Sequence, residues 1–276
     1  MAETSPKIIV FTDLDGTLLD DETYSASSSL PALRALQTRG VHVVLCSSKT
    51  RSEQMVLRDE IGIRDSYIVE NGSAIVIPPN TAVLAANSVE ESDGTKILIL
   101  GKRVDVIRAT LKIVTRDTHI SYKSFYDLLP EEVSQITGLD LVSAKLAKTR
   151  EFSETIVSRF NAYETSAFIA ACESHGLQCT QGGRFLSVTG GGADKGRAAR
   201  MLTGIYRPNF GEVLTVGIGD SPNDAPLLRE VDLPYLVQRP NGQWKTLDVP
   251  NLNRLSAVGP LGFVEMVNDL ILRGLI

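Results

Sequence analysis

Cysteine and histidine are both scarce in this chain of 276 residues, which contains three of each. The cysteines (Cys46, Cys172 and Cys179) form no Cys-x-x-Cys pair and cannot all pair with one another. This pattern suggests a reducing, cytoplasmic compartment. The histidines lack the spacing of metal ligands, so we expect them to be structural or surface residues.

Long apolar runs are also missing, because the longest are only the length of a β-strand, and no segment is expected to span a bilayer. Residues 1–7 lead into a strand-like run without the cationic and apolar regions of a signal peptide. Basic residues are fewer than acidic ones, and the resulting formal net charge of −5 argues against a nucleic-acid partner. We therefore expect a soluble intracellular protein that binds neither membranes nor nucleic acids. The oligomeric state is not determined by the sequence.

Apolar residues, at 43% of the chain, are numerous enough for a substantial core, and 22% of the residues are charged. The length predicts one large domain or two modest ones. A small phosphorylated metabolite needs only local positive charge, so the acidic balance is compatible with such a substrate.

The first part of the chain alternates between strand-like and helix-like segments. Apolar runs at 7–12, 41–46 and 67–70 read as strands, and helices are expected at 27–39 and 51–61 between them. This order predicts a parallel sheet covered by helices on both faces.

The pattern changes after residue 71 and resumes after three consecutive glycines at 190–192. Runs at 74–77 and 82–85 suggest a hairpin, and 95–100 is expected to begin a new unit. We predict an α/β fold with a doubly wound, mostly parallel, Rossmann-like sheet. Its core comprises 1–86 and 190–276, and an α+β cap comprises 87–189. The remaining expected elements are helices at 104–116, 164–175, 194–202 and 222–229, a polar helical region through 148, strands at 153–158, 212–218 and 234–237, and two strands around 181–183.

Acidic clusters follow two of the predicted strands. Asp13-Leu14-Asp15-Gly16-Thr17 follows the first strand, and Gly219-Asp220-Ser221-Pro222-Asn223-Asp224 follows a late one. A lone Asp-x-Asp would be read as a capped turn. Two such clusters at the carboxyl ends of neighbouring strands would repel each other unless a cation lay between them. Carboxylate oxygens of this kind suit Mg²⁺.

These residues resemble the four motifs of haloacid dehalogenase-like phosphatases. Asp-Leu-Asp-Gly-Thr, Ser47, Lys195 and Gly-Asp-Ser-x-Asn-Asp occur in the order typical of that family. The late position of the inserted unit is similar to the subclass with a large α+β cap, which mostly handles sugar phosphates.

Within that family the chain most resembles the mannosyl-3-phosphoglycerate phosphatase group. Four segments carry this likeness, and Ser47-Ser48-Lys49 stands where many capped relatives have Thr-Gly-Arg. The segments are 47–51, 69–72, 150–154, and 183–185 leading into 190–196.

The resemblance implies roles for the motif residues. Asp13 would attack phosphorus, Asp15 would act as the general acid and base, and Lys195 and Ser47 would stabilise the phosphoryl group. The resemblance also implies that Mg²⁺ is held by Asp13, the backbone carbonyl of Asp15, Asp220 and Asp224, with Asp224 acting through water or by orienting Lys195.

Other charged residues are weaker candidates for substrate contacts. Arg150, Glu151 and Glu154 would bind the sugar and the glycerate, although a solvated charged turn is an equally good interpretation. The segment containing Gly191 would either cradle phosphate or act as a hinge. Further candidates for anion contacts, each with a surface-charge alternative, are Lys49, Arg51 and Arg184.

The expected reaction is hydrolysis of mannosyl-3-phosphoglycerate to mannosylglycerate, a compatible solute, and phosphate. The glucosyl analogue, a broader range of sugar phosphates and a phosphomutase reaction are the enzymatic alternatives. A non-catalytic phosphometabolite sensor is the alternative from another class, but such a protein would be expected to lose the nucleophile or the metal ligands, and both sets are intact.

Overall fold

The computed structural model describes residues 6–79, 81, 88–182 and 184–276. Its central feature is a sheet of five strands in the order β12-β11-β10-β1-β2, and every neighbouring pair is parallel. The predicted doubly wound, mostly parallel fold is therefore confirmed. The strands are β1 (Lys7–Thr12), β2 (His42–Leu45), β10 (Val213–Gly219), β11 (Leu233–Gln238) and β12 (Asn253–Val258).

Helices cover both faces of this sheet, because successive side chains of a strand point to opposite sides. Along β1, Ile8 and Val10 pack in a cluster with side chains of α1 and α9, whereas Ile9 and Phe11 pack with side chains of α7 and α8. The covering helices are α1 (Leu30–Thr38), α2 (Arg51–Ile61), α7 (Lys195–Phe210), α8 (Ala225–Glu230) and α9 (Gly259–Leu272).

A small antiparallel sheet adjoins the core in the order β3-β4-β6-β5. Its first strand continues the core sheet through one parallel bridge, between Cys46 and Ile68. The predicted strand 82–85 lies outside the described residues, and the described partners of β4 are β3 and β6. The strands are β3 (Tyr67–Val69), β4 (Ala74–Ile77), β5 (Val89–Glu90) and β6 (Lys96–Ile99).

The position of β6 bears on the domain boundary. The sequence analysis assigned residues 87–100 to the cap. In the structure, β6 is hydrogen-bonded to β5 on one side and to β4 on the other, and β4 belongs to the small sheet beside the core. We therefore propose that the cap begins after Leu100 rather than at residue 87.

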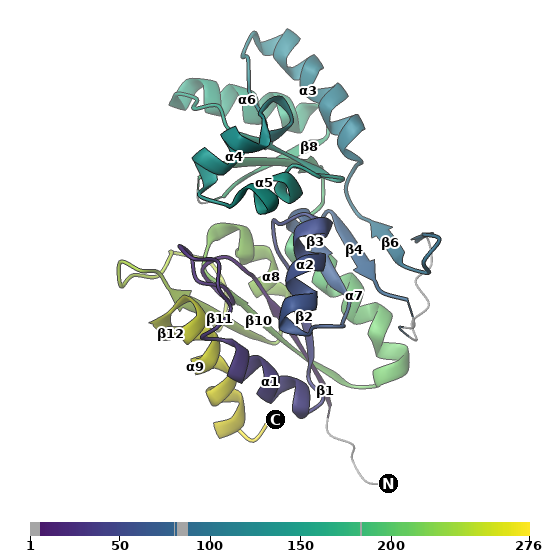
Figure 1. The fold of residues 1–276 in the computed structure, drawn as a ribbon, viewed down its shortest axis with the longest axis vertical. Helices are drawn as coiled ribbons and strands as arrows, with labels where there is room; N and C mark the ends of the chain where they lie inside the picture. Colours follow the sequence, from purple (N-terminus) through teal and green to yellow (C-terminus); the bar gives the residue numbers. More distant parts are fainter. Residues whose placement is uncertain (1–5, 80, 82–87, 183) are drawn as a thin grey trace.

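The inserted unit carries its own antiparallel sheet, β7-β9-β8, and its own apolar core between α3, α6 and that sheet. It lies at the top of Figure 1, and the C-terminus lies toward the opposite end of the molecule. No helix among the described residues is long and apolar enough to cross a membrane. The elements are α3 (Val104–Thr118), α4 (Pro130–Thr137), α5 (Leu141–Ala147), β7 (Ser153–Ile156), α6 (Ala162–Ser174), β8 (Leu177–Gln181) and β9 (Leu186–Gly190).

Candidate active site

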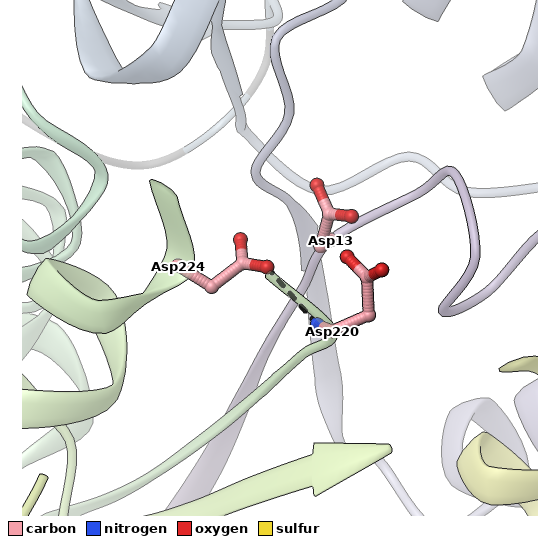
Figure 2. Close-up of side chains that lie close together, drawn as sticks. All are labelled: Asp13, Asp220 and Asp224. Carbon is pink, nitrogen blue, oxygen red and sulfur yellow. Dashed lines mark hydrogen bonds between the residues drawn. The ribbon is translucent and has the colours of Figure 1, made fainter. Parts of the chain in front are cut away.

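Three aspartates converge at the carboxyl end of the parallel sheet. Asp13 follows β1 and Asp220 follows β10, two adjacent strands, and Asp224 ends the short 3-10 turn η3 (Pro222–Asp224). All three are buried, and one carboxylate oxygen of each lies within 4.8 Å of the others. Figure 2 shows the carboxylates of Asp13 and Asp220 side by side, with Asp224 facing them from its turn. The sheet therefore brings together groups that are about 200 residues apart in the chain.

Lys195 neutralises part of this cluster. It is the first residue of α7, and its Nζ lies 2.6 Å from Asp13 Oδ1 and 2.6 Å from Asp224 Oδ1. Burial raises the pKa of the Asp13 carboxyl well above its ordinary value, and the Lys195 charge opposes that shift. Burial also raises the pKa of Asp220 to about 6, with a further contribution from the charge of Asp224.

Asp224 fixes the loop that carries Asp220. Its Oδ2 accepts hydrogen bonds from the backbone N–H groups of Asp220 (3.0 Å) and Ser221 (3.1 Å). A Cβ at Gly219 would lie 2.4 Å from Asp224 Cγ, so only glycine allows this approach. With its other oxygen on Lys195, Asp224 is placed to orient both the lysine and the loop.

Asp15 lies beside the cluster, and its side chain has a different partner. Lys49 Nζ lies 3.0 Å from Asp15 Oδ1 and 3.9 Å from Glu53 Oε1, at the start of α2. Ser47 is fully buried, and its Oγ accepts the backbone N–H of Lys49 at 3.2 Å. Asp15 is not in the three-carboxylate group, so its implied metal contact depends on its backbone carbonyl.

A cavity of about 220 Å³ opens from these residues toward the cap. Asp13, Asp15 and Asp220 line its core end, and Lys49, Arg150 and Arg184 are the predicted substrate residues that line it as well. The cap contributes neutral side chains that the sequence analysis did not single out, namely Thr137, Thr155, Thr180 and Ser187.

Four predicted substrate residues do not line this cavity. Arg51 is bound to Glu151 (Nε–Oε1, 2.8 Å) and to Glu91 (Nη1–Oε2, 2.7 Å). Glu154 is buried against Arg108, whose Nε lies 2.6 Å from its Oε2. Gly191 is exposed, and its N–H donates to a backbone carbonyl of the cap. The structure thus brings three of the seven predicted substrate residues to the cavity.

The cap is fastened to the core by Glu70, in the turn η1 (Glu70–Gly72). Its fully buried carboxylate accepts the backbone N–H groups of Glu151 (2.9 Å) and Phe152 (3.1 Å) and the hydroxyl of Ser153. Glu70 and Asn71 both adopt positive φ angles, 50° and 58°, which non-glycine residues seldom do. Such backbone strain is typical of functional turns.

The sequence analysis also missed Arg239, which follows β11 and lines the cavity. Its Nη1 donates to Asp220 Oδ2 at 2.6 Å. Because β11 is parallel to β10, the rule that ligands collect at carboxyl strand ends would have directed attention to it.

The donor set fits a divalent cation. Three buried carboxylates supply the hard oxygen ligands that Mg²⁺ prefers, and burial raises the pKa of two of them. Such a concentration of negative charge is costly without a cation, and Lys195 and Arg239 together offset only two of the three negative charges. Asp13, Asp220 and Asp224 are therefore the residues able to hold a metal.

Comparisons with known proteins agree with this geometry. Two curated relatives are both described as glucosyl-3-phosphoglycerate/mannosyl-3-phosphoglycerate phosphatase. The one from Methanococcoides burtonii is 40% identical over 96% of this chain and 97% of its own, and the one from Persephonella marina is 35% identical over 94% and 96%. A solved structure of a phosphatase from Bacteroides thetaiotaomicron has a TM-score of 0.69 at 17% identity, covering 100% of this chain and 98% of its own.

The family described as haloacid dehalogenase-like hydrolase matches residues 10–246, which include both acidic clusters and Lys195. The chain therefore belongs to the haloacid dehalogenase-like hydrolases.

Proposed function

We propose that this protein is a Mg²⁺-dependent phosphatase that hydrolyses mannosyl-3-phosphoglycerate to mannosylglycerate and phosphate. The observation that carries the proposal is the buried group of Asp13, Asp220, Asp224 and Lys195 at the floor of a capped cavity. The names of the relatives, which cover nearly the whole chain, supply the substrate class. The cysteines are free thiols, which supports a cytoplasmic location.

The reaction proceeds in two displacements. Asp13 attacks phosphorus and forms an acyl phosphate, while Asp15 protonates the departing glycerate oxygen. Asp15 then removes a proton from water, and that water attacks the acyl phosphate and releases phosphate. Lys195, fixed by Asp224, keeps a positive charge beside Asp13 throughout. A bound divalent cation would supply the charge that allows the anionic carboxylate and the anionic phosphate to approach each other.

The cap end of the cavity supports a substrate that carries a carboxylate and a sugar. Arg184 donates to the Thr137 carbonyl (2.9 Å) and to the Tyr24 hydroxyl (2.9 Å), neither of which neutralises its charge. Arg150 donates to the Ser48 carbonyl at 3.2 Å. These guanidinium groups suit a glycerate carboxylate, and the hydroxyls of the neighbouring cap strands suit sugar hydroxyls.

Glucosyl-3-phosphoglycerate is the second candidate substrate, because both curated relatives carry both sugar names. A broad sugar-phosphate phosphatase is the third. The epimers differ at one hydroxyl, so a discriminating cavity would need a specific hydrogen bond to that position.

A substrate panel tests the proposal. Released phosphate would be measured with mannosyl- and glucosyl-3-phosphoglycerate, 3-phosphoglycerate, simple hexose phosphates and sucrose phosphate. The glycosyl-3-phosphoglycerates should give the highest kcat/KM values. Equal turnover across simple hexose phosphates would contradict the specific assignment, and isomerised sugar phosphate in place of free phosphate would identify a mutase.

Chelation tests the metal. Excess EDTA should abolish phosphate release, and added Mg²⁺ should restore it. Undiminished activity in EDTA would remove the cation from the mechanism.

A further inference from the structure

Among the described residues, Arg239 is the positively charged residue that forms an ion pair with Asp220. The four family motifs give Arg239 no role. Its Nη1 lies 2.6 Å from Asp220 Oδ2, and both side chains line the cavity. Asp220 is the member of the three-carboxylate group that Lys195 does not contact, since the lysine hydrogen-bonds to Asp13 and Asp224. The charge of Asp220 is therefore offset chiefly by a different residue, which follows β11.

The backbone of Arg239 is held in a tight turn. Its N–H donates to the Gln243 carbonyl at 2.9 Å, and its own carbonyl accepts the N–H of Gly242 at 2.8 Å. Gly242 adopts a φ of 74°, which glycine tolerates without strain, and Gln238 also bonds to its carbonyl. The guanidinium thus extends from a fixed point beside the carboxyl end of β11.

The contact with Arg239 uses the Oδ2 atom of Asp220. A Cβ at Gly16 would lie 3.3 Å from Oδ2, so this oxygen lies against the Asp15-Gly16 turn as well as against Arg239. Figure 2 shows the Asp220 carboxylate beside that of Asp13. A carboxylate held at one oxygen by a charged hydrogen bond loses the freedom to rotate away from its neighbours.

We propose that Arg239 is a positioning residue, which holds the carboxylate of Asp220 in the orientation that receives a divalent cation. This inference rests on the cation in the proposed function. Groups that hydrogen-bond to a metal ligand orient it, and their loss commonly weakens metal affinity by about 10–100-fold. A competing role, in which Arg239 occupies the place of the metal, predicts the opposite change in affinity.

Metal affinity without substrate tests the proposal. Mn²⁺ or Mg²⁺ would be titrated by calorimetry into the metal-free wild type and the variants Arg239→Gln and Arg239→Lys. Arg239→Gln should weaken binding by about 10–100-fold, and Arg239→Lys should recover part of that loss because it keeps the charge. Arg229→Gln is the matched control, since Arg229 is an exposed arginine whose Nε bonds only a backbone carbonyl, and it should bind metal like the wild type.

The outcomes separate the two proposals. Unchanged affinity in Arg239→Gln would overturn the positioning role, and tighter binding would overturn it in favour of competition. A wild type that binds no divalent cation would overturn the proposed function itself. If Arg239→Gln fails to fold, the Arg239→Lys titration decides between the outcomes. Wild-type metal affinity in Arg239→Lys would show that the bonding geometry of the arginine is not needed, which would overturn the positioning role.

Discussion

The two ends of the cavity hold their charged groups in different ways. At the core end, carboxylates and cations pair directly, as Lys195 does with Asp13 and Asp224 and Arg239 does with Asp220. At the cap end, the guanidinium groups of Arg150 and Arg184 donate mainly to neutral oxygens. Arg150 also forms a longer ion pair with the buried carboxylate of Glu70, at 3.7 Å, whereas Arg184 donates to neutral oxygens alone.

This difference divides the work of the site. Paired charges fixed at strand ends are pre-organised for chemistry, because they need little rearrangement as the transition state forms. Arg184, whose hydrogen-bond partners are neutral, retains charge for a ligand to neutralise, which favours recognition. The comparison therefore predicts that damage at the core end lowers kcat, whereas damage at the cap end raises KM.

The sharpest way to test this division is to remove the nucleophile. Asp13→Asn should lower kcat by on the order of 10³-fold or more, because an amide does not form the acyl phosphate. Phosphate release and circular dichroism would be measured together, and the fold should persist. Asp59→Asn, at an exposed carboxylate, is the control. Normal activity in Asp13→Asn would refute the nucleophile assignment.

The next effect should appear at the cap end. Arg184→Gln should raise KM for the glycosyl-3-phosphoglycerate by about tenfold or more, since it removes a charged donor, and kcat should change little. Arg116→Gln, on the exposed face of α3, is the matched control. A fall in kcat with unchanged KM would break the proposed division of roles.

The pH dependence of metal binding probes the core end alone. Asp220 has a pKa of about 6, raised by burial, and it must be ionised to bind a cation. Lowering the pH from 7 to 5 should therefore weaken metal affinity by about tenfold. A metal affinity that is constant from pH 7 to 5 would contradict this role of Asp220.

The metal-free protein should respond to pH in the opposite sense. Because the pKa of Asp220 is higher in the folded protein than the ordinary 3.8, the folded state binds more protons between these values. The contribution of this group to stability should therefore rise as the pH falls from 6 toward 4. Thermal unfolding of the wild type, compared with Asp220→Asn, measures that contribution.

The smallest effect on activity is expected at Glu154. The structure places it in a buried pair with Arg108, so Glu154→Gln should lower the free energy of unfolding of the cap by about 1–3 kcal/mol and leave KM within about twofold. Chemical denaturation and steady-state kinetics would be compared with Glu131→Gln, at an exposed position. A large rise in KM at unchanged stability would instead indicate that Glu154 contacts the sugar of the substrate.

Most of the core fold follows from the sequence because its strands are apolar runs separated by helices and glycines. The last strand and helix were not predicted, and their residues explain why. In β12 only Leu255 is a buried apolar residue, so no apolar run marks the strand. The helix α9 begins with Gly-Pro-Leu-Gly, a typical loop signal, yet a Cβ at Gly262 would lie 2.6 Å from Val237, so close packing requires that glycine.

The core end of the site was predictable for a geometric reason, and part of the cap end was not. Parallel strands have their carboxyl ends at the same edge of the sheet. The residues that follow these strands therefore lie close together, even when they are far apart in the sequence. The side chains of β7 alternate between two faces, so Thr155 lines the cavity and Glu154 points to Arg108 on α3. Charge alone could not tell which face of that strand the cavity occupies.

The Glu70 contacts determine how the molecule can open. Residues 151–153 are tied to the core by a buried carboxylate, and the carbonyl of Glu151 also accepts the N–H of Val104 where the chain first crosses into the cap. Detaching them would deprive a buried carboxyl group of three hydrogen-bond donors, which is costly. We therefore expect the cap to rotate about Glu70 as a pivot, and reactants to pass on the side of the cavity where Tyr24 bonds to Arg184 and to the Thr137 carbonyl.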